Sequence, residues 1–166
     1  MSAPSHGETP FTGVRIRFGS SKSIDEVIAG LLDDVGHQPV SLDRVAADND
    51  TWDQYRAAVE SHVGPSGFML FAVLDHGAWI KKAGIEQRAV RFVIGNPLIA
   101  ITMLRHDVTA GLFAPVELLV VEEPSGGSSL TYVRPSSLMV VEPNAELLSA
   151  AEALDTKLEA LAAKVT

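Results

Sequence analysis

The sequence predicts an α+β fold, with helices on one face of a mainly antiparallel sheet of about five strands. Five stretches have the apolar or alternating pattern of strands, and they lie at about 14–18, 68–74, 89–94, 115–123 and 130–134. Parallel neighbours need a long crossover, which is usually a helix. Because the predicted strands outnumber the predicted crossover helices, most neighbouring strands must run antiparallel.

The first strand and the first helix have clear local signals. In the strand, apolar residues alternate with two arginines that we expect to face water: Val14, Arg15, Ile16, Arg17 and Phe18. Ser23 and Glu26 then have the spacing of a capping box, in which each side chain binds a free backbone N–H at a helix start. The apolar residues of the predicted helix share one face: Ile24, Val27, Ile28, Leu31, Leu32 and Val35. Gly36 is a typical residue for the C-terminal end of this helix.

Residues 37–67 are more polar than the rest of the chain and predict an insertion with one peripheral helix. Thr51 and Gln54 again have capping-box spacing. A thin apolar stripe follows this cap, and it consists of Trp52, Tyr55, Val59 and Val63. The turn signal GPSG at residues 64–67 ends the insertion.

The middle of the chain alternates strands with short connections. The stretch HGAWIKKA, residues 76–83, predicts a short turn or helix. Asn96 is a good N-cap and Pro97 suits the first helical position, so a helix is predicted over residues 98–105. The glycine-rich stretch PSGGS at residues 124–128 predicts a hairpin connection between the last two strands.

Residues 144–165 predict a long helix that packs on the sheet. Its apolar residues recur at spacings of four and three: Leu147, Ala151, Leu154, Leu158, Leu161 and Val165. The same repeat is typical of a coiled-coil seam, which is the alternative. Because the edges of an open sheet need protection and dimerisation provides it, we expect a homodimer.

Length, composition and charge narrow the class of protein. The 166 residues predict one α+β domain over residues 11–166, after a disordered N-terminal tail over residues 1–10. The chain has no cysteine, which excludes disulfides, thiolate metal sites and a cysteine nucleophile. The formal net charge of −8 repels phosphate backbones, so we expect no nucleic-acid partner. No apolar run approaches the roughly 20 residues of a membrane span, so we expect a cytoplasmic protein with no membrane partner.

The stretch FAVLDHG, residues 71–77, ends an apolar strand with Asp75 and His76. A carboxylate beside an imidazole can orient the ring for general acid–base chemistry, which makes both residues candidate catalytic groups. Neighbouring strand residues point to opposite faces, so the pair meets only if the chain turns at Gly77. The alternative, which we favour, is that Asp75 caps the short helix that follows.

Other motifs have simpler structural explanations. GSSKS at residues 19–23 would suit an anion, but it lacks the spacing of a phosphate-binding loop, and a helix cap explains it. Gly95, Asn96 and Pro97 are explained by a helix start, although such a loop can also present the Asn96 amide to a ligand. The five histidines show no metal-ligand spacing, and no GxSxG motif is present. We therefore expect no metal and no cofactor.

The order of these motifs resembles the family called domain of unknown function 302. FAVLDHG is followed by AGI, FVIGNP, APVELLVVEE and LTYVRPSSL. The resemblance extends from Val14 to about Leu138. It implies a curved sheet in the order strand, helix, four strands and helix, like half of the TATA-binding protein, and it favours a dimer. Such a fold does not by itself imply DNA binding.

We expect a non-catalytic binding module that holds a small, largely apolar molecule and acts as a dimer. The pocket is expected near His76, Trp79, Asn96 and Tyr132, which would place a few polar groups among apolar walls. Apolar residues near connections are candidates for those walls: Trp79, Met103, Leu104, Leu112 and Phe113. One alternative is an enzyme that uses His76 as general acid or base, oriented by Asp75 or Asn96. Another is a protein–protein interaction adaptor.

Overall fold

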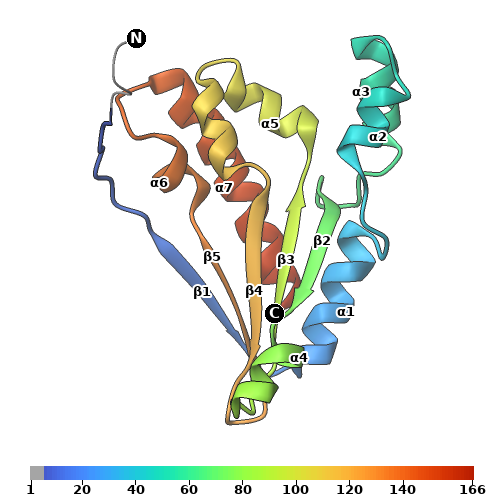
Figure 1. Ribbon diagram of the computed structural model, residues 1–166, viewed down its shortest axis with the longest axis vertical. Helices are drawn as coiled ribbons and strands as arrows, with labels where there is room; N and C mark the ends of the chain where they lie inside the picture. Colours follow the sequence, from blue (N-terminus) through green and yellow to red (C-terminus); the bar gives the residue numbers. More distant parts are fainter. Residues whose placement is uncertain (1–5) are drawn as a thin grey trace.

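The sheet is antiparallel, with helices on one of its faces (Figure 1). The computed structural model describes residues 6–166, and its strands lie in the order β1-β5-β4-β3-β2. Each strand pairs with its neighbour in antiparallel register. The strands are β1 (Arg15–Ser20), β2 (Met69–Asp75), β3 (Ala89–Gly95), β4 (Val116–Glu122) and β5 (Ser128–Val133). The predicted α+β fold with a five-stranded antiparallel sheet is confirmed.

Two amphipathic helices supply the layer that buries one face of the sheet. They are α1 (Ile24–Val35) and α7 (Ala145–Val165), and α7 runs behind the strands in Figure 1. The whole predicted stripe of α7 is buried in the core: Leu147, Ala151, Leu154, Leu158, Leu161 and Val165. The stripe therefore packs on the chain's own sheet, and the coiled-coil alternative is wrong because no apolar seam remains for a partner helix.

Strand alternation divides the sheet into a buried face and an open face. Phe92 on β3 lies opposite Leu118 on β4, and both are buried beneath the helices. The next pair along these strands, Arg91 and Leu119, points to the other side because side chains alternate across a sheet. Arg17 on β1 shares this second face. The open face therefore carries both charged and apolar side chains.

The insertion contains two helices where the sequence predicted one. They are α2 (Leu42–Ala47) and α3 (Trp52–Glu60). The predicted capping box of α3 is present, since Thr51 and Gln54 exchange both hydrogen bonds. Ser41 caps α2 by accepting the Arg44 N–H. With only six residues and no buried side chain, α2 is too short to produce an apolar periodicity that a sequence pattern reveals.

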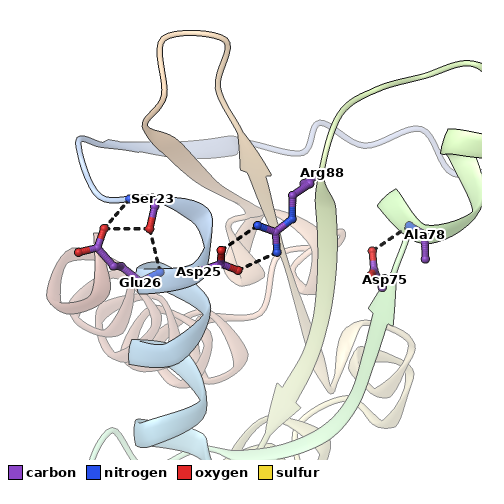
Figure 2. Close-up of polar contacts among 6 residues, drawn as sticks. All are labelled: Ser23, Asp25, Glu26, Asp75, Ala78 and Arg88. Carbon is purple, nitrogen blue, oxygen red and sulfur yellow. Dashed lines mark hydrogen bonds and ion pairs between the residues drawn. The ribbon is translucent and has the colours of Figure 1, made fainter.

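The end of β2 is the helix cap that the sequence favoured. The Asp75 Oδ1 accepts the backbone N–H of Ala78 at 3.0 Å, as Figure 2 shows. This contact starts the short helix α4 (Gly77–Ile80), which continues as the 3-10 turn η1 (Lys81–Ala83). The N-cap position itself is His76, whose side chain makes no cap hydrogen bond. Asp75 thus supports the helix start from one residue earlier, which confirms its predicted contact with the backbone that follows.

Three short helical segments lie at the opposite end of the sheet. They are α5 (Pro97–Leu104), the 3-10 segment η2 (Val108–Phe113) and α6 (Pro135–Met139). Asn96 and Pro97 begin α5 as predicted. The sequence did not predict α6, whose first turn is held by a distant residue. The Ser136 N–H donates to the Asp155 Oδ1 on α7 at 3.0 Å.

Two ion pairs fix α1 against the rest of the molecule. Near its start, Arg88 donates to both carboxylate oxygens of Asp25 at 2.7 and 2.9 Å (Figure 2), and these hydrogen bonds lower the pKa of Asp25. Near its end, the buried Asp34 accepts the Ser66 N–H at 3.1 Å and the Lys164 Nζ at 2.8 Å. This second contact joins α1, the loop before β2 and α7.

The N-terminal segment precedes the first strand. The predicted disordered tail over residues 1–10 falls partly on residues 1–5, which lie outside the described residues. Residues 6–10 are exposed and have no helix or strand. Within the described part of the chain, no helix combines the length and the apolar character that a membrane span requires.

We predict that Asp34→Asn lowers the free energy of unfolding by about 1–3 kcal/mol at neutral pH, because a buried charge-assisted contact is lost. Burial alone would raise the pKa of Asp34, but the hydrogen bonds from Lys164 and Ser66 outweigh it and lower the pKa. The charged form is therefore the stabilising one. Its contribution is present above the unfolded-state pKa of about 4 and is lost as the pH falls through the folded-state value.

Urea unfolding at neutral and at acid pH measures this contribution. The exposed neighbour Asp33 provides the control variant Asp33→Asn, which we expect to unfold like the parent protein. Equal stability of Asp34→Asn and the parent protein at neutral pH would contradict the role given to Asp34.

We predict that Asp75→Ala lowers the free energy of unfolding by about 1 kcal/mol, as for other lost helix caps. Asp75→Asn keeps a side-chain oxygen that accepts the Ala78 N–H, so we expect it to retain most of that stability. Thermal unfolding of the two variants measures the difference. If Asn destabilised as much as Ala, the carboxylate charge would matter beyond the cap.

Candidate functional site

A cavity of about 340 Å³ lies between α5, the α2–α3 insertion and the adjoining ends of β2 and β3. We call it the α5 cavity, and Figure 1 shows α2, α3 and α5 at the same end of the sheet. Its principal walls are apolar and aromatic side chains from separate elements: Trp52, Tyr55, Phe68, Ile99, Met103 and Leu154. An apolar concavity with a few polar groups is the usual form of a small-molecule site.

Asn96 positions α5 along one side of this cavity. Its Oδ1 accepts the Leu98 N–H at 2.8 Å, which caps α5. Its Nδ2 donates to the Gly67 carbonyl oxygen at 2.9 Å, which joins the start of α5 to the loop before β2. Both ends of the amide are therefore engaged with the backbone. Asn96 therefore has a structural role in the cavity wall, because it holds the start of α5 in place.

A close approach at Gly95 brings Phe71 into the same wall. The register of the β2–β3 pair shifts between Leu70 and Ala72, so Phe71 stands outside the regular alternation and lines the cavity. A Cβ atom on Gly95 would lie 2.9 Å from Cε2 of Phe71 and 3.2 Å from Cβ of Pro115. Only glycine leaves both rings room at this position.

Two aromatic residues of α3 bring polar groups to the cavity. The rings of Trp52 and Tyr55 lie 5.8 Å apart, and Trp52 is 50% exposed. Burial raises the pKa of the Tyr55 hydroxyl. The phenol hydroxyl is therefore neutral at physiological pH, and the indole N–H of Trp52 does not titrate. They offer hydrogen bonds to a ligand and no charge.

A second concavity of about 680 Å³ lies on the open face of the sheet, and we call it the sheet groove. The charged side chains in its lining are Arg15, Arg91 and Glu117, and the imidazole of His76 lies beside them. Arg91 and Glu117 form an ion pair with each other. The groove shares only Pro115 and Val116 with the α5 cavity, so the two concavities are neighbours with different chemistry.

Of the four predicted ligand-binding residues, Tyr132 is the most buried, with 5% of its surface exposed. It borders the sheet groove, but its ring stacks on Phe18 with centroids 6.4 Å apart. Burial, followed by the nearby carboxylates of Glu159 and Asp155 on α7, raises the pKa of Tyr132 to about 12. Its hydroxyl therefore stays protonated and belongs to the contact between the sheet and α7.

His76 and Trp79 pair with each other at the other end of the sheet from Asn96. The Trp79 Nε1–H donates to the His76 Nδ1 at 3.3 Å, and Trp79 is 60% exposed. His76 borders the sheet groove, whereas Trp79 lines neither concavity. Among residues 6–166, His76 has no carboxylate within hydrogen-bonding distance, and Asp75 is engaged with Ala78.

The topology explains why the four residues share no single pocket. Because β2 and β3 are antiparallel, Asp75 lies opposite Val90 near the start of β3, while Gly95 at its end lies opposite Met69. His76 and Asn96 follow the C-terminal ends of these two strands and therefore stand at opposite ends of the sheet. The structure thus does not assemble His76 with Asp75 or Asn96, and the individual binding roles stay predictions.

The apolar wall residues are distributed over the two concavities as well. Met103 and Leu104 line the α5 cavity, and Leu112 and Phe113 line the sheet groove. The contribution of the insertion to the α5 cavity was not predicted. The one signal in the sequence that could have indicated it is the pair of aromatic residues, Trp52 and Tyr55, in an otherwise polar segment. Among residues 6–166, no group of three or more histidine, aspartate or glutamate side chains has a metal-binding arrangement.

The comparisons with known proteins agree on the family. A family model described as "Domain of unknown function DUF302" matches residues 44–165, which is more than half of the chain. No curated protein matches the chain.

A solved structure supports the same assignment at the level of the fold. It is the crystal structure of an uncharacterized conserved DUF302 protein from Bacillus stearothermophilus. The two chains are 16% identical with a TM-score of 0.64, and the match covers 92% of this chain and 98% of the other. This likeness shows a shared fold. The match of the family model over residues 44–165 shows that the chain belongs to the DUF302 family.

Proposed function

We propose that this DUF302 protein binds a small, largely apolar molecule in the α5 cavity and does not transform it. The observation that carries the proposal is a cavity of about 340 Å³ whose walls come from α3, α5, α7 and the strand ends. Small-molecule sites typically have volumes of about 300–1,000 Å³ and mostly apolar linings. The α5 cavity fits the lower part of that range.

The expected affinity follows from the apolar area that a ligand would bury. A ligand that buries about 300 Å² of apolar surface gains on the order of 7 kcal/mol. The entropy lost on association reduces that gain. Because that cost is at least about 4 kcal/mol, we expect only weak binding of simple apolar probes, with dissociation constants in the millimolar range. A natural ligand with a polar group suited to Trp52 and Tyr55 would bind more tightly.

We predict that filling the cavity weakens the binding of an uncharged apolar probe, N-phenyl-1-naphthylamine. Ala100 on α5 lines the cavity, so Ala100→Leu places additional carbon atoms inside it. We expect the dissociation constant to rise at least about fivefold, which corresponds to about 1 kcal/mol. The control variant Ala160→Leu makes the same change on the exposed side of α7.

Tryptophan fluorescence reports the location of the probe. The chain has two tryptophans, and Trp79 lines neither concavity, so Trp79→Phe leaves Trp52 as the sole reporter at the α5 cavity. We expect energy transfer from Trp52 to the probe in this background, and we expect Ala100→Leu to shift its concentration dependence to higher probe concentration by the same factor. Equal binding by Ala100→Leu and Ala160→Leu, with both folded, would overturn the proposal.

The proposal includes self-association as a homodimer through the edge of β2. Val40 N–H donates to the Leu70 carbonyl oxygen and covers the beginning of that edge. The later residues Val73–Asp75 have backbone partners only on β3 among the described residues. Large apolar side chains are exposed on β2 and just after it: Val73, Leu74, Trp79 and Ile85. An edge strand of this kind pairs readily with a second copy around a twofold axis.

We predict that Leu74→Lys converts the dimer to a monomer, because a charge on an edge strand opposes strand pairing. Leu74 is 42% exposed, so the substitution leaves the core unchanged. The control is Val141→Lys, at an apolar residue of similar exposure that is not on β2. Light scattering after size-exclusion chromatography measures the mass. A parent protein that is monomeric, or a Leu74→Lys protein that stays dimeric, would contradict this interface.

The two other hypotheses, an enzyme centred on His76 and a protein–protein adaptor, stay predictions. If the probe does not bind the α5 cavity and apolar surface residues instead govern association with other proteins, the adaptor becomes the better account.

A further inference from the structure

The sheet groove has a charge that differs from that of the chain as a whole. The full chain carries a formal net charge of −8. The groove is lined by Arg15 and Arg91 against the single carboxylate of Glu117, with His76 at its border. The fixed charge of the groove is therefore positive. A positive concavity on an acidic protein attracts a small anion more strongly than the surrounding surface does.

One arginine carries that positive charge. Arg91 pairs with Glu117, and the neighbouring Arg17 donates to the Glu123 Oε1 at 2.6 Å. Among residues 6–166, Arg15 has no carboxylate partner, although it lines the groove. Its guanidinium is a fork of N–H donors that matches a carboxylate. The groove thus contains one cationic position that no carboxylate of residues 6–166 neutralises.

Apolar side chains surround this cationic position. Arg15 lies opposite Val133 in the β1–β5 pair, and both residues line the groove. Leu119 contributes to it from β4 and Leu138 from α6, while Phe113 borders it from η2. A ligand that leaves water here buries apolar surface on these residues while its charged group stays at the edge strand.

We propose that the sheet groove is a second binding site, for a small amphipathic carboxylate that pairs with Arg15 and lays its apolar body over Leu119 and Val133. The single unpaired arginine suits one negative charge. A polyanion would meet the repulsion of the whole chain. The volume of about 680 Å³ suits a small molecule. This inference is independent of ligand binding in the α5 cavity.

Octanoate and octan-1-ol form a matched pair of probes, because they share one apolar chain and differ in charge. Titration of isotope-labelled protein followed by amide NMR shifts gives both the dissociation constant and the location. We expect octanoate to shift the amides of Arg15, Leu119 and Val133. We expect octan-1-ol to shift them less, since it has no charge for Arg15 to bind.

The variant Arg15→Gln tests the role of the guanidinium. We expect it to weaken octanoate binding about fivefold, which is the effect of about 1 kcal/mol for an exposed charge pair, and to leave octan-1-ol unchanged. Arg15→Lys keeps the charge and should restore part of the affinity. Arg134→Gln removes an exposed arginine that does not line the groove and should leave binding unchanged.

Three results would overturn the inference. In the first, octanoate shifts amides only at the α5 cavity, around Ile99, or nowhere. In the second, folded Arg15→Gln binds octanoate as tightly as the parent protein. In the third, Arg15→Gln and Arg134→Gln weaken octanoate equally, which would show a general effect of charge. None of these results bears on whether an uncharged probe enters the α5 cavity, so the two proposals fail separately.

Discussion

The burial of one sheet face beneath α1 and α7 is the constraint on which the rest of the structure depends. Leu154, Leu158 and Leu161 fix α7 to the same core that contains Phe92 and Leu118. Because strand side chains alternate, every residue committed to this core sends its neighbours to the opposite face. The open face and its arginines are therefore a consequence of the packing. A chain with a single helical layer has one covered face and one face left for other contacts.

The antiparallel pairing of β2 and β3 then determines which polar side chains lie close together. It carries Asp75 and His76 to one end of the sheet and Gly95 and Asn96 to the other. At the first end, the Asp75 carboxylate accepts the backbone N–H of Ala78, and the Trp79 indole N–H donates to His76. At the second end, α5 and the insertion lie next to the strand ends and line the α5 cavity. The proposed apolar site thus lies at the other end of the sheet from Asp75 and His76, the two residues that the sequence indicates as catalytic candidates.

The sequence predicts those features whose signals are local. The Ser23–Glu26 capping box and the Asn96-Pro97 helix start concern residues within a few positions, and both are present in the structure. The helix α6 was missed because its anchor, Asp155, lies 19 residues away. Asn96, Met103 and Leu104 were predicted as pocket residues and line the α5 cavity. The part of the insertion was missed because the cavity joins Trp52 to Ile99 and Leu154. No single-sequence pattern relates side chains that only the tertiary fold brings together.

The most direct test of the account is a crystal structure of the protein grown with 1-bromonaphthalene. This probe is uncharged, apolar and marked by the anomalous scattering of bromine. Concave sites with mostly apolar linings take up ligands of this kind. The account predicts a bromine peak inside the α5 cavity, between Trp52, Ile99 and Leu154. A cavity without a peak, or a peak only on the open face of the sheet, would contradict the claim that the insertion and α5 form a binding site.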